Sequence, residues 1–129
     1  MKKFLIIVLA LYGACYYVGS NYHPHDALAY AKKHPQAKWA PAADYYVGFA
    51  YYQRGRYEPA QEAFNQLLMD YPTCQYVPKA LVYLSDVQET NHDWEAAKSS
   101  LTRYAEDFPN GADISLVTKR LELLKYRHP

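Results

Sequence analysis

Apolar residues recur at helical spacing on both sides of a short turn within residues 44–72. Gly55 lies between the two apolar segments and allows the chain to leave the first helix in a left-handed conformation. Pro59 suits the first turn of a second helix, and Pro72 ends that helix because proline has no backbone N–H to donate. The pattern therefore predicts two short helices joined by a tight turn.

Small and large residues in this segment are placed so that two helices can pack closely. Gly48 and Ala60 are small, which lets the backbones of the two helices approach where they cross. Tyr51 and Phe64 are large and fill the space beside that crossing. Two helices of this length cannot bury their apolar faces alone, so we expect further helices to stack against them.

The same pattern returns along the chain with a fixed period. Prolines occupy positions 35, 72 and 109, so successive prolines lie 37 residues apart. Two sets of large or apolar residues share this spacing: Tyr30, Leu67 and Tyr104, and Ala27, Phe64 and Leu101. This self-similarity predicts a repeat array that consists of a lone helix, two helix pairs and a closing helix.

The best-matched segment resembles a tetratricopeptide repeat, whose template asks for small, large and turn residues at fixed offsets. The matching positions are Asp44, Val47, Gly48, Tyr51, Ala60, Phe64 and Pro72. Only Asp44 departs strongly, because the template has tryptophan at that position. The second repeat matches less well, with Ser85 in the small position and Gln88 in the large one.

This resemblance implies an all-α fold in which antiparallel helix pairs stack as a short solenoid, after an N-terminal hydrophobic helix. The expected units are a signal or anchor (residues 1–20) and a repeat domain (21–129), made of a half repeat (24–36), two repeats (41–74 and 78–111) and a closing helix (112–126).

The chain begins with two lysines and an uncharged apolar run over residues 4–19. Such a segment is an export or anchoring signal, which places the rest of the chain across the membrane. One outcome is retention as a transmembrane helix, although the run is shorter than the roughly 20 residues that span a bilayer. A second is lipidation of Cys15, because the residues before it resemble a bacterial lipobox. The third is cleavage after residues 18–20.

The ends of the predicted helices also indicate a location. Their Tyr-Pro and Phe-Pro endings resemble the tetratricopeptide subclass of envelope proteins, such as the outer-membrane assembly lipoproteins. We therefore expect a protein of the bacterial cell envelope, anchored in the membrane with its repeats on the periplasmic side, or alternatively a lipoprotein.

Motifs for catalysis and cofactor binding are absent from the sequence. It has no glycine-rich phosphate loop, no Gly-x-Ser-x-Gly elbow and no His-Glu-x-x-His zinc motif. With 14 basic and 13 acidic residues, the chain has no charge excess that would attract nucleic acid. We therefore expect no enzyme activity, no cofactor and no nucleic-acid partner.

A few single residues suggest chemistry but have simpler interpretations. His23 and His25 could supply two metal ligands, yet no third ligand accompanies them, so a solvated linker without metal is favoured. Cys74 is either a small half-buried residue or the site of an intermolecular disulfide, and we favour the first.

The resemblance also implies a binding surface, because the first helix of each pair lines a concave groove in this family. In each first helix, one groove residue directly follows the small residue. Two more lie four residues before and three residues after that groove residue. They are Tyr45, Phe49 and Tyr52 in the first repeat, Lys79, Val82, Asp86 and Glu89 in the second, and Lys119, Leu123 and Tyr126 in the closing helix. The groove is predicted to have an aromatic end, an acidic middle and a basic end. The alternative is that the closing helix or the N-terminal helix covers the aromatic residues.

These patterns favour a membrane-tethered, non-enzymatic scaffold that binds or assembles a partner protein through the groove. The alternative is a structural accessory subunit packed within a larger membrane or filament complex. In both cases the partners are proteins and, through residues 4–19, the membrane, and either a homo-oligomer or a hetero-oligomer is compatible with the sequence.

Overall fold

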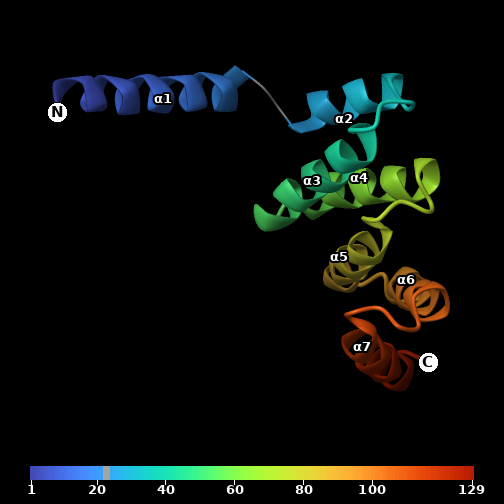
Figure 1. Ribbon diagram of the computed structural model, residues 1–129. Coiled ribbons are helices and arrows are strands. Elements are labelled where there is room, and N and C mark those ends of the chain that lie inside the picture. Colours follow the sequence, from blue (N-terminus) through green and yellow to red (C-terminus); the bar gives the residue numbers. More distant parts are fainter. Residues whose placement is uncertain (22–23) are drawn as a thin grey trace.

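The computed structural model describes residues 1–21 and 24–129. All regular structure in these residues is helical, which confirms the predicted all-α fold. The helices are α1 (Lys2–Asn21), α2 (Pro24–Lys33), α3 (Ala40–Gln53), α4 (Tyr57–Asp70), α5 (Val77–Thr90), α6 (Trp94–Asp107) and α7 (Ile114–Arg127). From α2 onward each helix packs against its neighbour in the chain, and together they form a stack (Figure 1).

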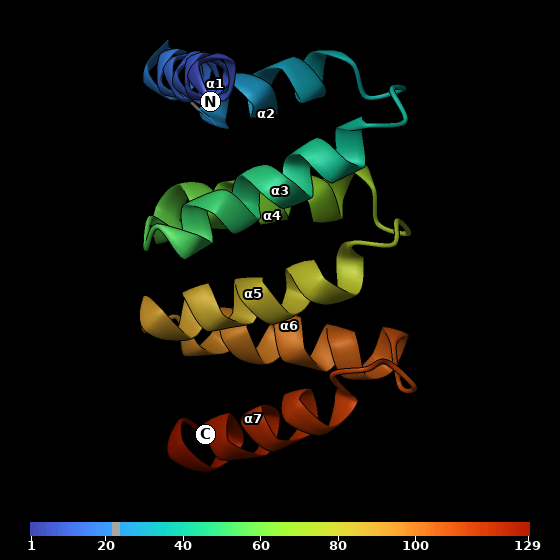
Figure 2. The ribbon, with the colours of Figure 1, turned by 60° about the vertical axis from the view of Figure 1, so that its left-hand side comes forward.

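The stack repeats every 37 residues. The helices α3, α5 and α7 begin at Ala40, Val77 and Ile114, and α4 and α6 begin at Tyr57 and Trp94. Figure 2 shows the resulting layers, with α2 at one end, the pairs α3–α4 and α5–α6 between, and α7 at the other end. This arrangement of neighbouring pairs is consistent with the predicted solenoid.

The turn within each helix pair uses one residue in the left-handed conformation. Gly55 has a φ angle of 71°, and His92, which lies 37 residues later, has a φ angle of 60°. The backbone N–H of the next residue then donates to the end of the first helix, as Arg56 does to the carbonyl oxygen of Tyr51 at 2.9 Å. The turn therefore reverses the chain while it satisfies a carbonyl group that the helix end leaves open.

The core follows the small and large positions of the repeat. Phe64 is fully buried, and a Cβ atom added to Gly48 would lie 2.7 Å from the nearest ring carbon of Phe64. Gly48 is therefore needed because the ring occupies the space of its side chain. In the second pair Gln88 takes the large position, and its amide oxygen accepts a hydrogen bond from Ser100 Oγ at 2.7 Å. This bond satisfies the polar group that the weaker repeat buries.

The first helix, α1, extends sideways from the stack (Figure 1). Its apolar side chains are exposed along its length, with Phe4, Leu9 and Tyr16 as examples. Across residues 1–21 and 24–129, no helix is both long enough and apolar enough to cross a membrane. The structure therefore does not support the transmembrane helix expected from the sequence. The apolar run over residues 4–19 falls short of the roughly 20 residues that a bilayer requires.

Candidate functional site

An aromatic cluster lies on the surface formed by α3, α5 and α7, which we call the inner face. Tyr83 on α5 is at its centre, with its ring centroid 5.5 Å from that of Phe49 and 5.0 Å from that of Tyr52. Tyr76, just before α5, stacks on Tyr45 with the two centroids 4.9 Å apart. The three predicted aromatic residues of α3 are half-buried. Among the described residues, the ring contacts that partly cover them come from the next repeat and from α4 of their own pair.

Polar contacts continue from the aromatic cluster towards α7. The Tyr52 hydroxyl donates a hydrogen bond to the Asp86 carboxylate, and this bond raises the pKa of Tyr52 to about 12. Arg120 on α7 contacts both acidic residues of α5, with its Nη2 atom 3.5 Å from Asp86 Oδ1 and 2.8 Å from Glu89 Oε1. The middle of the inner face is therefore partly neutralised and keeps one net negative charge.

The remaining predicted positions are either held in contacts or exposed. Lys79 pairs with Asp113 at 2.9 Å, and this hydrogen bond raises the pKa of Lys79 above its usual value. Val82 packs half-buried against the core. The exposed group consists of Lys119, Leu123 and Tyr126 on α7. The structure thus brings the positions of α3 and α5 together and leaves those of α7 at an open end.

Two residues at the centre of the inner face, Tyr83 and Arg120, are absent from the predicted groove. They lie 37 residues apart, and each reaches back from its helix to the preceding first helix. The signal that could have found them is the repeat period itself, because it aligns Tyr46, Tyr83 and Arg120 as large side chains next to the predicted positions.

The α3–α4 pair also carries a match to a known family. Residues 42–73 match the model of the tetratricopeptide repeat family. No curated protein matches the chain. Tetratricopeptide repeats generally mediate protein–protein interaction and are typically not catalytic, which supports a scaffold role for the matched pair.

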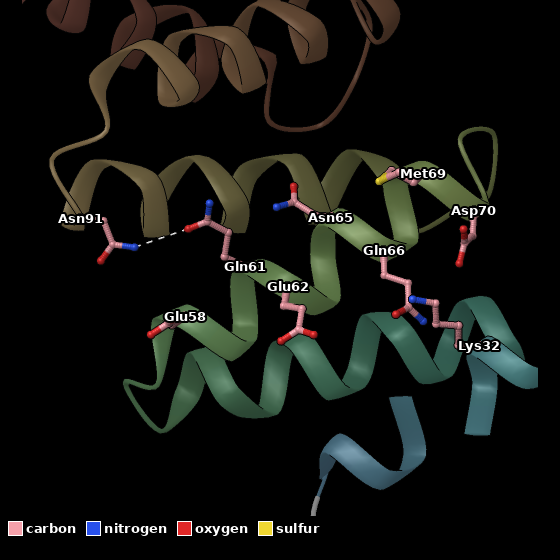
Figure 3. A pocket seen from close by; sticks show the side chains of 9 residues that line it. All are labelled: Lys32, Glu58, Gln61, Glu62, Asn65, Gln66, Met69, Asp70 and Asn91. Atoms are coloured by element: carbon pink, nitrogen blue, oxygen red, sulfur yellow. Dashed lines mark hydrogen bonds between the residues drawn. The ribbon is translucent and has the colours of Figure 1, made fainter. Parts of the chain in front are cut away.

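A hollow of about 920 Å³ lies over α4 of the matched pair and includes no residue of the aromatic cluster. Its side chains project mainly from α4, with Lys32 of α2 and Asn91 at its margins (Figure 3). Three of the lining residues are acidic: Glu58, Glu62 and Asp70. A polar, open lining of this kind lacks the apolar walls that enclose a small molecule, so we do not assign a ligand site here.

Asp44 holds the tryptophan position of the tetratricopeptide template and is fully buried. Its Oδ1 atom accepts a hydrogen bond from Gln66 Nε2 at 3.1 Å, whereas its Oδ2 atom has no hydrogen-bond partner in the described part of the chain. Burial, together with the nearby charge of Asp70, raises the pKa of Asp44 to about 6, and the Gln66 bond opposes this change. The ionised form of this carboxyl is therefore costly in the folded state.

The other residues singled out in the sequence have simple surroundings. Cys15 is exposed on α1, Cys74 is half-buried against the core, and both are free thiols. His23 and the side chain of His25 lie outside the described residues. In the described part of the chain, no three ligand-type side chains are grouped to bind a metal ion. Lipidation of Cys15 stays a prediction.

Proposed function

We propose that the inner face formed by α3, α5 and α7 binds a protein partner, so that the chain acts as a non-enzymatic scaffold. The observation that carries this proposal is the half-buried aromatic cluster in which Tyr45, Phe49 and Tyr52 converge on Tyr83. Aromatic side chains that are held in place on an accessible face lose little entropy on binding and are frequent hot spots.

The neighbouring charges indicate the chemistry of the partner. Asp86 and Glu89 share the single positive charge of Arg120, so this group carries one net negative charge beside the aromatic cluster. We expect a partner segment that places an aromatic or large aliphatic side chain against the cluster and a basic side chain about one or two helical turns away.

Phe49→Ala tests the inner face. Truncating a hot-spot aromatic costs about 2 kcal/mol or more, which corresponds to a loss of roughly 30-fold in affinity. The tagged full-length chain is cross-linked in cells, and the captured proteins are quantified by mass spectrometry against the wild type. Phe49→Ala should deplete a defined subset of these proteins.

The matched control is Met69→Ala on α4, where the side chain is 81% exposed and lies away from the inner face. It should leave recovery unchanged. Thermal unfolding separates binding from folding, because Phe64→Ala in the core should cost ~3–5 kcal/mol and Phe49→Ala much less. If Phe49→Ala captures the same proteins as the wild type, the inner face is not the binding surface.

We also propose that the protein is exported and stays associated with the cell envelope through residues 4–19, with its repeats on the periplasmic side. The support is the order of charges, because Lys2 and Lys3 precede an exposed apolar helix, which keeps the N-terminus in the cytoplasm. A phosphatase fused after Pro129 should be active only outside the cytoplasm, and an active cytoplasmic reporter at the same place would refute export. Cys15→Ser should block processing if the protein is a lipoprotein and have no effect if α1 is retained.

A further inference from the structure

The two ends of the stack expose complementary halves of a repeat. By the 37-residue spacing, α2 corresponds to the second helix of a pair, because its Tyr30 aligns with Leu67 of α4 and Tyr104 of α6. By the same spacing α7 corresponds to a first helix, like α3 and α5. Figure 2 shows α2 and α7 at opposite ends of the stack, and α1 runs sideways from it (Figure 1). Within the described chain, each end therefore lacks the helix that would complete its pair.

Contacts between successive first helices follow one rule inside the chain. Tyr83 covers Phe49 and Tyr52 of the preceding first helix, with centroid distances of 5.5 and 5.0 Å. One period later, Arg120 covers the two acidic residues of α5 that stand 37 residues after Phe49 and Tyr52. We call Tyr83, Arg120 and their counterparts covering residues. Each covering residue contacts the residues at two fixed positions of the preceding first helix.

The N-terminal end of the stack presents covering residues without a helix to cover. Tyr46 lies 37 residues before Tyr83 and is 58% exposed, and Trp39 lies 37 residues before Tyr76 and is 45% exposed. Tyr30 is 56% exposed, although its counterparts in α4 and α6 are almost fully buried. Tyr30 stacks on Trp39 with the ring centroids 5.6 Å apart, and Tyr46 packs against Tyr45 and Tyr76 with centroid distances of 5.1 and 6.0 Å. We call the exposed rings of Tyr30, Trp39 and Tyr46 the aromatic edge.

The C-terminal end presents the opposite arrangement. Leu123 and Tyr126 on α7 lie 37 residues after Asp86 and Glu89, so they hold the positions that are covered on α3 and α5. They are 52% and 87% exposed. Lys119, one turn earlier, is also exposed. The last helix therefore offers an apolar pair and one cation at the positions that a following first helix would cover.

We propose that a second copy of this chain docks head to tail, with α7 of one copy against α2 and α3 of the next. The 37-residue stack then continues across copies, because α7 supplies the first helix and α2 the second helix of a composite repeat. By the internal rule, Leu123 and Tyr126 contact Tyr46 of the second copy. Lys119 lies over the ring of Trp39 of the second copy, where the ammonium group gains a cation–π contact.

Side-chain sizes favour the pairing of α7 with α2 of a second copy over the pairing of either helix with a partner helix like those in α3–α4. Within α3–α4 the small residue Gly48 faces the large residue Phe64. In α7 the counterpart of Gly48 is Glu122, and in α2 the counterpart of Phe64 is Ala27, so large and small are exchanged between the two helices. Glu122 would clash with a regular second helix, and Ala27 would leave a gap against a regular first helix. In size the two match each other, and the Glu122 carboxylate reaches solvent at the edge of the contact, because an unpaired charge is costly to bury.

A head-to-tail contact joins two different surfaces, so it does not close at two copies unless the rotation happens to form a ring. The proposal therefore predicts chains of copies rather than dimers. It rests on exposed residues at the two ends of the stack, some of which belong to the inner face, and not on the aromatic cluster around Tyr83, so the two proposals are tested separately.

Disulfide cross-linking of the full-length chain tests the geometry. In a background of Cys15→Ser and Cys74→Ser, the test variant carries Tyr46→Cys and Leu123→Cys, both at exposed positions. Mild oxidation should give a ladder of dimers, trimers and longer species on a non-reducing gel, and a thiol should collapse it to monomer. The two new thiols lie on opposite ends of one copy, so they cannot pair within it.

The matched control combines Met69→Cys with Leu123→Cys, which keeps two exposed thiols but moves one of them to α4. It should give no ladder. A ladder of equal intensity in the control would mean that α1 clusters the chains at random, and it would overturn the proposal. Dimers alone, or no cross-links, in the test variant would overturn it as well.

Sedimentation in a non-ionic detergent, which shields α1, gives an independent readout without new thiols. The average mass of the wild type should rise with protein concentration, and Tyr46→Glu should abolish that rise because it places a charge in the aromatic edge. An identical concentration dependence in both proteins would contradict docking at this end.

Discussion

The buried carboxyl of Asp44 gives the stability of the domain a pH dependence opposite to that of a salt-bridged carboxylate. In the unfolded chain the carboxyl titrates near 3.8, and burial beside Asp70 raises the pKa to about 6 in the folded chain. Because the folded state holds this proton more tightly, the contribution of Asp44 to the free energy of unfolding is highest below about pH 4 and is lost as the pH rises through about 6. The difference between the two pKa values corresponds to roughly 3 kcal/mol, a large share of the stability of a small domain.

Asp44→Asn removes the charge and keeps the shape of the side chain. The amide oxygen can still accept the hydrogen bond that Gln66 now donates at 3.1 Å. At about pH 7 the variant should be more stable than the wild type by roughly 1–3 kcal/mol, where the lower value allows for the cost of a buried amide N–H without a partner. Near pH 4 this advantage should disappear, because the wild-type carboxyl is then neutral.

Urea unfolding followed by far-UV circular dichroism measures this difference at each pH, provided that the m value is the same for both proteins. Asp70→Asn is the control, since it removes the nearby like charge from an exposed side chain and should give a smaller gain of the same sign. If the curves of the wild type and Asp44→Asn run parallel between about pH 4 and about pH 7, Asp44 does not titrate from a buried site and the reasoning fails.

Two substitutions test the packing of the repeats. Gly48→Ala should lower the melting temperature, because the new Cβ atom would lie 2.7 Å from the Phe64 ring. Overpacking costs ~1–3 kcal/mol, which offsets or exceeds the ~1 kcal/mol that alanine gains in helix propensity. Gly13→Ala, with no described atom within 4 Å, is the control, and equal melting temperatures would refute the argument. Ser100→Ala should cost roughly 1–3 kcal/mol in urea unfolding, because it leaves the amide of Gln88 buried without its partner. Adding Gln88→Leu should restore most of the lost stability. If stability does not recover, the missing hydrogen bond is not the cause of the loss.

The helices and their pairing could be predicted because their determinants are local. A glycine at φ 71° fixes the turn at Gly55, and the contact between Gly48 and Phe64 is encoded by residue size at a constant spacing. The surface could be predicted only in part, because it depends on how far side chains reach between repeats. Tyr83 covers residues of α3, and Arg120 pairs with residues of α5, yet each lies beside a predicted position rather than on it. A helical pattern read from one repeat does not contain these contacts.

One repeat position sets the character of the inner face without disturbing the core. Tyr46, Tyr83 and Arg120 follow one another at this position, and each faces a neighbouring repeat rather than its own pair. Aromatic residues lie under Tyr83, and acidic residues lie under Arg120, so the covering residue and the residues it covers are matched in kind. The face can therefore change from aromatic to charged in a single step along the stack, while each helix pair keeps a buried core. The same matching applies at the ends, where the exposed part of the Tyr46 ring calls for an apolar pair, and the exposed pair on α7 is apolar.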